Sequence, residues 1–90
     1  MKEVIFDSAK IETVDELHTA IAKLLKFPPH YGKNLDALYD CLSGDVKLPV
    51  RFVWKNYSLT ESHLGSDAEA VLQTMIDFSS EEDSFALVVL

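Results

Sequence analysis

The stretch from His30 to Gly44 reads HYGKNLDALYDCLSG and predicts a loop followed by a short helix with two different faces. Asn34 can cap this helix, because an asparagine side chain accepts a hydrogen bond from a free backbone N–H in the first turn. Gly44 suits the left-handed residue that ends many helices. Apolar residues recur between them at helical spacing and predict a stripe that faces the core. The stripe consists of Leu35, Leu38 and Leu42, with Ala37 and Cys41 at its edges.

The other face of this helix is polar and carries Asp36, Tyr39, Asp40 and Ser43. Carboxylates four residues apart repel each other and destabilise an isolated helix by roughly 0.2–0.5 kcal/mol. The helix dipole stabilises Asp36 in the first turn, but Asp40 lies too far along the helix to gain much. Helix stability therefore does not explain Asp40. The same spacing is also typical of any polar helix face that contacts solvent, so it does not by itself establish a site.

Upstream of this stretch the chain predicts one strand and one helix. Glu3 to Asp7 is too short for a helix and is rich in strand formers. Thr13 followed by Glu16 is a capping-box pattern, and apolar residues keep helical spacing from there to Lys26. The prolines at positions 28 and 29 end this helix, because proline lacks a backbone donor.

Downstream of the stretch the chain predicts a strand over 50–54 and a short helix over 56–64. Ser66 followed by Glu69 is a second capping-box pattern and predicts the start of the last helix. The continuous apolar run over 85–90 is typical of a strand buried on both faces of a parallel sheet. The face of the last helix that is expected to pack on the core contains Ala68, Val71, Leu72, Met75, Ile76 and Ser79.

Strands that alternate with helices predict an α/β fold with right-handed crossovers. We expect a small three-stranded parallel sheet packed with about four helices. A chain of 90 residues can bury enough apolar surface to fold without disulfides or metals, and 48% hydrophobic residues argue against disorder. Residues 1–90 are therefore expected to form a single domain.

Fifteen acidic and eight basic residues give a formal net charge of −7. This charge disfavours direct binding to nucleic acid or to an anionic membrane, and it suits a basic protein partner. Cys41 is the only cysteine, which excludes an internal disulfide and a multi-cysteine zinc site. No stretch reads as a signal peptide or a membrane span, so a cytoplasmic location is expected.

The residues offer little for catalysis, and we expect neither an enzyme nor a cofactor or metal site. His18, His30 and His63 have no metal-ligand spacing and are expected at the surface. A small hydrolase could use Asp36 and Asp40 or Cys41, but paired carboxylates need unequal environments in a cleft to act as acid and base. A binding role explains the same face better, because phenols and carboxylates are effective partners for arginine-rich surfaces.

Two separate parts of the chain resemble the barstar family of bacterial ribonuclease inhibitors. The first comprises Tyr31-Gly32, Asn34 to Leu38, Asp40 to Leu42, and Gly44. The second comprises Gly65, Ala68-Glu69, Val71 to Gln73 and the closing apolar strand. The two parts match in order and spacing, so the resemblance covers essentially the whole chain.

The resemblance implies an intracellular inhibitor of a basic, barnase-type extracellular ribonuclease, and a monomer is the simplest expectation for a small inhibitor. In that family the matching helix and loop plug the active site of the enzyme, and the carboxylate that matches Asp40 occupies the place of an RNA phosphate. The family pattern also implies a cis peptide bond before Pro49. The partner-binding residues implied by the resemblance, with their close neighbours on the same face, are His30, Tyr31, Gly32, Asn34, Asp36, Tyr39, Asp40, Ser43, Gly44, Asp77 and Glu81.

The chain departs from the family pattern at four positions near this surface. His30 stands in place of a tyrosine, Lys33 in place of a glutamate, and Tyr39 and Asp45 in place of tryptophans. Lys33 reverses a charge and His30 can titrate near neutral pH, so the enzyme recognised is expected to differ at its rim. An acidic interaction module of the same fold with a partner other than a ribonuclease is the alternative.

Overall fold

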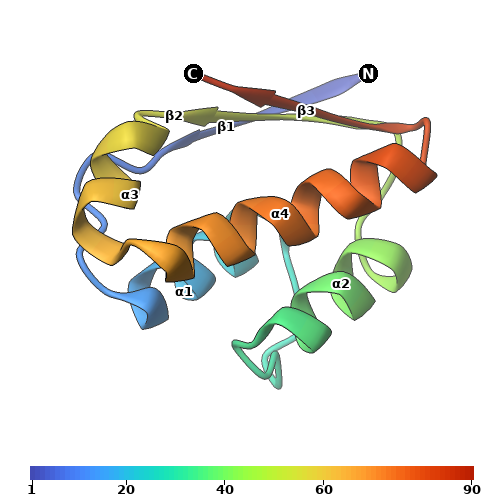
Figure 1. The fold of residues 1–90 in the computed structure, drawn as a ribbon. Helices are drawn as coiled ribbons and strands as arrows, with labels where there is room; N and C mark the ends of the chain where they lie inside the picture. The colour runs from blue at the N-terminus through green and yellow to red at the C-terminus, as the bar shows by residue number, and fades with distance from the viewer.

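The computed structural model describes residues 1–90 and confirms the predicted α/β class (Figure 1). Three parallel strands form one sheet in the order β1-β2-β3, so β2 is the central strand. The elements in chain order are β1 (Lys2–Asp7), α1 (Val14–Leu25), α2 (Leu35–Gly44), β2 (Val50–Lys55), α3 (Tyr57–Leu64), α4 (Ser66–Glu81) and β3 (Phe85–Val89).

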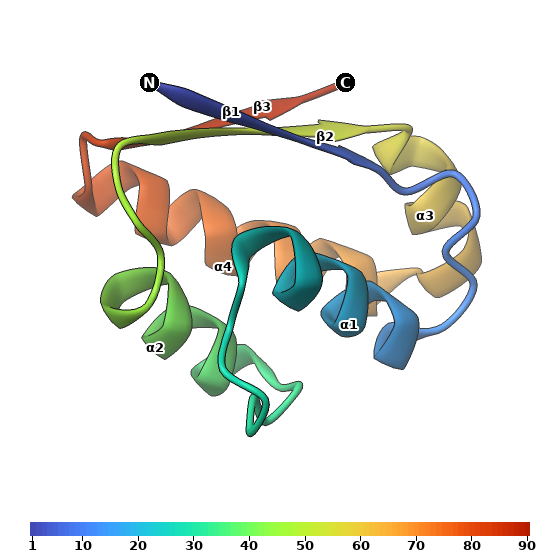
Figure 2. The same ribbon diagram turned by 180° about the vertical axis from the view of Figure 1, so that it is seen from behind.

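All four helices lie on one face of the sheet, as the two opposite views in Figures 1 and 2 show. Alternate strand residues such as Phe52 and Trp54 point into the helical layer and are fully buried. Ile5 on the other face is 51% exposed. The prediction that the last strand is buried on both faces is therefore wrong: β3 is an edge strand, and only Phe85 in it is buried.

The core lies between this sheet and the helices. It contains Leu17 and Ile21 from α1, Leu38 and Leu42 from α2, and Val71 and Met75 from α4, none of them more than 1% exposed. The indole N–H of Trp54 donates a hydrogen bond to Ser8 Oγ at 2.7 Å, which satisfies the one polar atom of a fully buried side chain. The apolar faces of the helices thus have the sheet and one another as partners.

The ends of the helices confirm some of the sequence signals and contradict others. Thr13 and Glu16 form the expected capping box at the start of α1. The Ser66 capping box is absent, because only Gly65 separates α3 from α4 and Ser66 is already the first residue of the helix. Gly65 makes this junction with a positive φ of 57°, which glycine adopts without steric cost.

Gly44 does not have the predicted left-handed conformation. It is the last residue of α2, and Asp45 caps the helix with φ −116°. The backbone N–H of Asp45 donates to the carbonyl oxygen of Cys41 at 2.8 Å, so the helix ends without a left-handed residue. The Leu48–Pro49 peptide bond in the following loop is cis, as the family resemblance implied.

The buried face of α4 is rotated slightly from the predicted one. Phe78 is buried and Ile76 is 39% exposed, because the buried positions continue the spacing of Ala68, Val71 and Met75. Both chain termini lie at the sheet, whereas α2 lies on the opposite side of the molecule (Figure 1). None of the helices combines the length and the apolar character that a membrane span requires.

Candidate functional site

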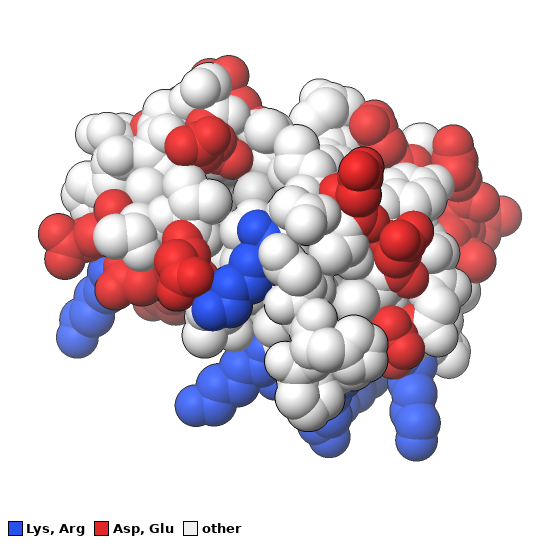
Figure 3. All heavy atoms as spheres, turned by 90° about the horizontal axis from the view of Figure 1, so that it is seen from below, with Lys and Arg blue, Asp and Glu red and all other residues white.

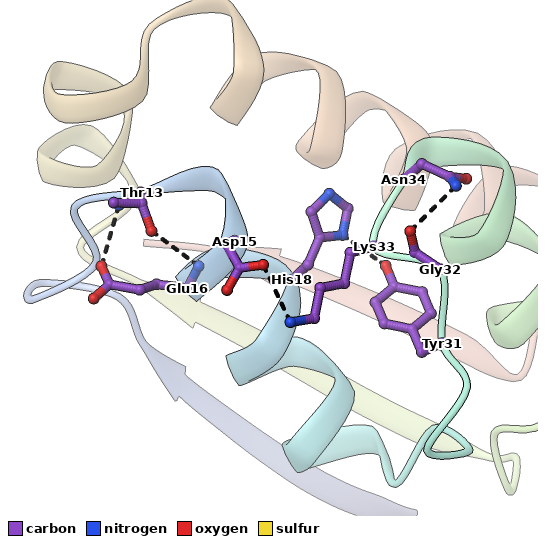
Figure 4. A network of polar contacts seen from close by, with 8 residues as sticks. All are labelled: Thr13, Asp15, Glu16, His18, Tyr31, Gly32, Lys33 and Asn34. Atoms are coloured by element: carbon purple, nitrogen blue, oxygen red, sulfur yellow. Dashed lines mark hydrogen bonds and ion pairs between the residues drawn. The ribbon is translucent and has the colours of Figure 1, made fainter.

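A structured turn leads into α2. Asn34 caps the helix as predicted: its Oδ1 accepts a hydrogen bond from the N–H of Ala37 at 2.8 Å. Its Nδ2 donates to the carbonyl oxygen of Gly32 at 3.3 Å, so one side chain holds both sides of the turn (Figure 4). Lys33 between them has a positive φ of 52°, an uncommon backbone conformation for a residue with a side chain.

The apolar face of α2 fixes the direction of its polar face. Leu38 and Leu42 are fully buried and Cys41 is 7% exposed, as the spacing predicted. Leu35 was expected in the same stripe but is 41% exposed. Leu35 is the first residue of α2, at the end of the helix that lies farther from the sheet (Figures 1 and 2).

The polar face presents two carboxylates without internal partners. Asp36 and Asp40 are exposed, and neither side chain makes a hydrogen bond or an ion pair within the chain. Ser43 is also exposed, and its hydroxyl donates to the backbone carbonyl oxygen of Asp40 at 3.1 Å. The face therefore offers acceptors to an outside molecule.

Helix α4 packs beside α2 and adds two further carboxylates. Asp77 and Glu81 are exposed and lie one helical turn apart. Glu81 accepts a hydrogen bond from the hydroxyl of Tyr39 on α2, and Asp77 Oδ1 accepts one from Gln73 Nε2 at 2.8 Å. The hydrogen bond to Glu81 is the largest cause that raises the pKa of Tyr39, followed by burial and the nearby negative charges of Glu81 and Asp77.

The loop before α2 is attached to α1 at two points (Figure 4). The hydroxyl of Tyr31 lies 2.6 Å from Nδ1 of His18, and Nζ of Lys33 lies 3.1 Å from Oδ1 of Asp15. His18 is 3% exposed, so the expectation of a surface histidine is wrong for it. His18 lies three residues before Ile21, and this helical spacing places it on the apolar face of α1. The burial of His18 could therefore have been predicted from the sequence.

Burial shifts the pKa values of both groups in this contact. It lowers the pKa of His18, an effect that the charge of Asp15 opposes and the charge of Lys33 reinforces. It raises the pKa of Tyr31 to about 12. Both side chains are therefore neutral at pH 7, which allows an uncharged hydrogen bond beneath the loop. Neither His18 nor Asp15 was identified from the sequence as a residue that supports the site.

The remaining predicted site residues differ in their surroundings. His30 is exposed and has no hydrogen-bond partner in the chain. A Cβ atom at Gly32 would lie 3.2 Å from Asn34 Nδ2 and 3.4 Å from the Cβ of Ala37, so a side chain there would crowd the turn. A Cβ atom at Gly44 would meet nothing within 4 Å. The fold itself gives no reason for glycine at position 44.

Cys41 is buried in the apolar face of α2. Burial is the first cause that raises the pKa of Cys41, which keeps its thiol protonated and weakly nucleophilic. No group of three or more His, Cys, Asp or Glu side chains is placed to hold a metal ion. Figure 3 shows acidic side chains over much of the helical face and most of the lysine and arginine side chains along one edge, although not all of them lie there.

Two comparisons relate the chain to ribonuclease inhibitors. The model of the family described as "Barstar (barnase inhibitor)" matches residues 1–90. A protein of Bacillus subtilis (strain 168) named "Putative ribonuclease inhibitor YrdF" is 39% identical over 90 residues, which cover 99% of each chain. Since both matches extend over the whole length, the chain belongs to the barstar family of barnase inhibitors, whose members are not enzymes.

Proposed function

We propose that the protein inhibits a barnase-type ribonuclease inside the cell that produces it, by covering the active site with α2 and the loop before it. The observation that carries this proposal is the state of Asp36 and Asp40, two exposed carboxylates one turn apart with no donor in their own chain. Such carboxylates are free to accept bidentate hydrogen bonds from arginine, as an RNA phosphate does. The pair therefore imitates the charge of the substrate backbone.

The acidic residues of α4 support the same proposal. Asp77 and Glu81 extend the acidic surface from α2 onto the neighbouring helix. Tyr39 on α2 contacts α4 at two points. Its ring packs edge-on against Phe78, and its hydroxyl donates a hydrogen bond to Glu81. An active site that binds a polyanion is itself basic, so a broad acidic surface on a rigid support is complementary to it.

The attachments of the loop should favour binding. Tyr31 is held by His18, Lys33 by Asp15, and Gly32 by Asn34. A loop that already has its bound conformation loses little conformational entropy when the complex forms. We expect the backbone of this loop to move little on binding.

The departures from the family pattern bear on which ribonuclease is recognised. Lys33 introduces a positive charge, but its ion pair with Asp15 directs that charge toward α1. His30 is exposed and free to meet a partner residue, and Asp45 follows the end of α2 as a further carboxylate. These side chains set the rim of the surface, where charge and shape select one partner over another.

Titration of a purified barnase-type ribonuclease, with RNA cleavage as the readout, tests the proposal. Wild-type protein is expected to abolish cleavage near one-to-one stoichiometry. Asp40→Ala should raise the inhibition constant by about 10- to 100-fold, since a hydrogen bond to a charged group contributes roughly 1.5–3 kcal/mol. Asp67→Ala is the matched control, because it also replaces an exposed aspartate by alanine. Asp67 lies in the first turn of α4, at the other end of that helix from Asp77 and Glu81.

Equal inhibition by wild type and Asp40→Ala would remove Asp40 from the binding surface. If folded wild-type protein inhibits none of a panel of barnase-type enzymes, the proposed inhibition is wrong. Capture of another basic protein by the wild type, and not by Asp40→Ala, would then identify the surface as an acidic interaction module with a different partner.

A further inference from the structure

A cavity of about 280 Å³ opens beside the C-terminal end of α2, next to the proposed inhibitory surface, which consists of the polar face of α2, the loop before it, Asp77 and Glu81. It lies between the start of β1, the end of α1 and the loop that joins α2 to β2. Asp45, which belongs to the rim of that surface, is the only lining residue that the two sites share. Five aliphatic side chains form its apolar part: Val4, Leu24, Leu25, Val46 and Val50.

Three lysines line the same cavity with a single carboxylate. Lys2, Lys26 and Lys47 come from three separate segments, and Asp45 is the only acidic residue among them. None of the three lysines belongs to either of the two ion pairs in the structure. In a chain with a net charge of −7, this cavity has the opposite sign to the rest of the molecule.

Lys26 shows how the fold directs one of these charges to the cavity. It ends α1 in the left-handed conformation, with φ 58°, a position that usually holds glycine. A glycine would avoid the steric cost of that conformation but would leave the cavity without this ammonium group. The cavity thus combines aliphatic side chains with three lysines in its lining.

We propose that this cavity binds a small organic anion with an aliphatic body. The alkyl chain would cover the five aliphatic side chains, and a carboxylate or phosphate head group would lie among the lysine ammonium groups, which recognise compact anions as point charges. The lining contains no aromatic ring on which a nucleotide base could stack. The volume lies near the lower end of the range of about 300–1,000 Å³ for ligand sites, which suits a chain of medium length rather than a whole lipid.

The proposal can be tested with octanoate and octyl phosphate as probes, both below their micelle concentrations. Amide chemical shifts recorded during each titration are expected to saturate, with the largest changes at Val4, Lys26 and Val46. Inorganic phosphate and 1-octanol supply the head group and the chain separately, and each should bind at least tenfold more weakly. Binding of either one as tightly as the whole anion would overturn the proposal.

Charge-removing variants locate the site. Lys47→Gln and Lys26→Gln should each raise the dissociation constant of octanoate about two- to fivefold, as expected for exposed charge pairs. Together they should raise it about tenfold. Lys23→Gln and Lys10→Gln make the same change outside the cavity and should leave it unchanged.

Lys47 lies in a loop outside the helices and strands, so its variant keeps the test valid if Lys26→Gln alters the end of α1. Affinities that are the same for all four variants would overturn the proposal. Chemical shift changes spread over the surface without saturation would overturn it as well. Inhibition of a ribonuclease is not the readout, so the result is independent of the proposed function.

Discussion

Tyr39 and Glu81 join the two helices that carry the proposed inhibitory surface. The hydroxyl of Tyr39 on α2 donates to the carboxylate of Glu81 on α4, and its ring lies edge-on to Phe78 with a centroid distance of 5.7 Å. Removal of the hydroxyl alone in Tyr39→Phe keeps the ring contact but frees the carboxylate. We expect the fold to persist, inhibition to weaken, and the circular dichroism spectrum to stay unchanged.

The matched control for this change is Tyr57→Phe. Tyr57 also donates to a glutamate, Glu61 at 3.4 Å, but it lies on α3, outside the proposed surface. Its variant should inhibit as the wild type does. If both variants inhibit equally well, Glu81 does not need Tyr39 to hold it in position.

Asp40→Ala should leave the free energy of unfolding equal or raise it slightly, although it weakens inhibition. The change relieves the repulsion between Asp36 and Asp40, worth roughly 0.2–0.5 kcal/mol in a helix. Asp36→Ala relieves the same repulsion but loses a favourable interaction with the helix dipole, so it should not stabilise the protein. Urea unfolding of both variants measures the difference, and a large loss of stability in Asp40→Ala would make Asp40 a structural residue.

Gly44→Ala should stabilise the free protein and weaken inhibition. A Cβ atom at this position meets nothing in the chain, and glycine in the middle of a helix costs roughly 0.5–1 kcal/mol relative to alanine, so the gain at the last residue of α2 should be at most that. The methyl group would instead stand between α2 and a ribonuclease. Thermal unfolding and enzyme titration test the two effects separately.

Gly65→Ala is the comparison for Gly44→Ala, because the backbone conformation at position 65 favours glycine. Gly65 has φ +57°, so alanine there is strained and should lower the melting temperature. Because Gly65 lies outside the proposed inhibitory surface, the inhibition constant of the folded variant should not change. An unchanged inhibition constant in Gly44→Ala would show that no partner approaches Gly44 closely.

Association with the ribonuclease should slow as ionic strength rises. The chain carries a net charge of −7, and the Debye length falls from about 30 Å at 0.01 M salt to about 10 Å at 0.1 M. Stopped-flow measurements are expected to show a steep fall in the association rate constant and a smaller change in the dissociation rate constant. An association rate that is insensitive to salt contradicts the role proposed for the acidic surface.

Stability should fall as the pH drops below 6.5, with His18 as one cause. Burial lowers the pKa of His18 beneath its ordinary value of 6.5, so the unfolded chain takes up a proton in this window while the folded chain does not. Unfolding that binds a proton becomes more favourable at lower pH. Urea unfolding between pH 7 and 5 should show this slope in the wild type and a smaller slope in His18→Gln.

The exposed histidines provide the control for the pH experiment. His30→Gln and His63→Gln make the same substitution at exposed histidines and are the matched variants for His18→Gln. An identical slope in all three variants would assign the pH dependence to other groups.

Local signals in the sequence predicted the local structure well. The Thr13 capping box and the Asn34 cap depend on residues within one turn, so the sequence contains everything that they require. The same rule failed at Ser66, because the tight junction at Gly65 starts α4 one residue earlier. The prediction that β3 is buried on both faces was also wrong, because a continuous apolar run does not specify whether helices cover one face of the sheet or both.

The candidate site was predicted only in part, because the sequence shows which residues share one helix face but not which helices pack together. The spacing of Asp36 and Asp40 placed both on one face of α2, and the structure confirms that arrangement. The contacts between distant elements were missed, in particular the contact of His18 with Tyr31, which are 13 residues apart. Pairs of this kind depend on how helices pack, and helical periodicity describes only one helix at a time.

The position of the two termini has a practical consequence. Both ends of the chain lie at the sheet, across the molecule from α2. An affinity tag, a fluorescent fusion or a linker to a sensor chip at either end would therefore leave the acidic helix facing outward. Immobilised in this way, the protein is expected to capture its ribonuclease from solution with the same stoichiometry as the free inhibitor.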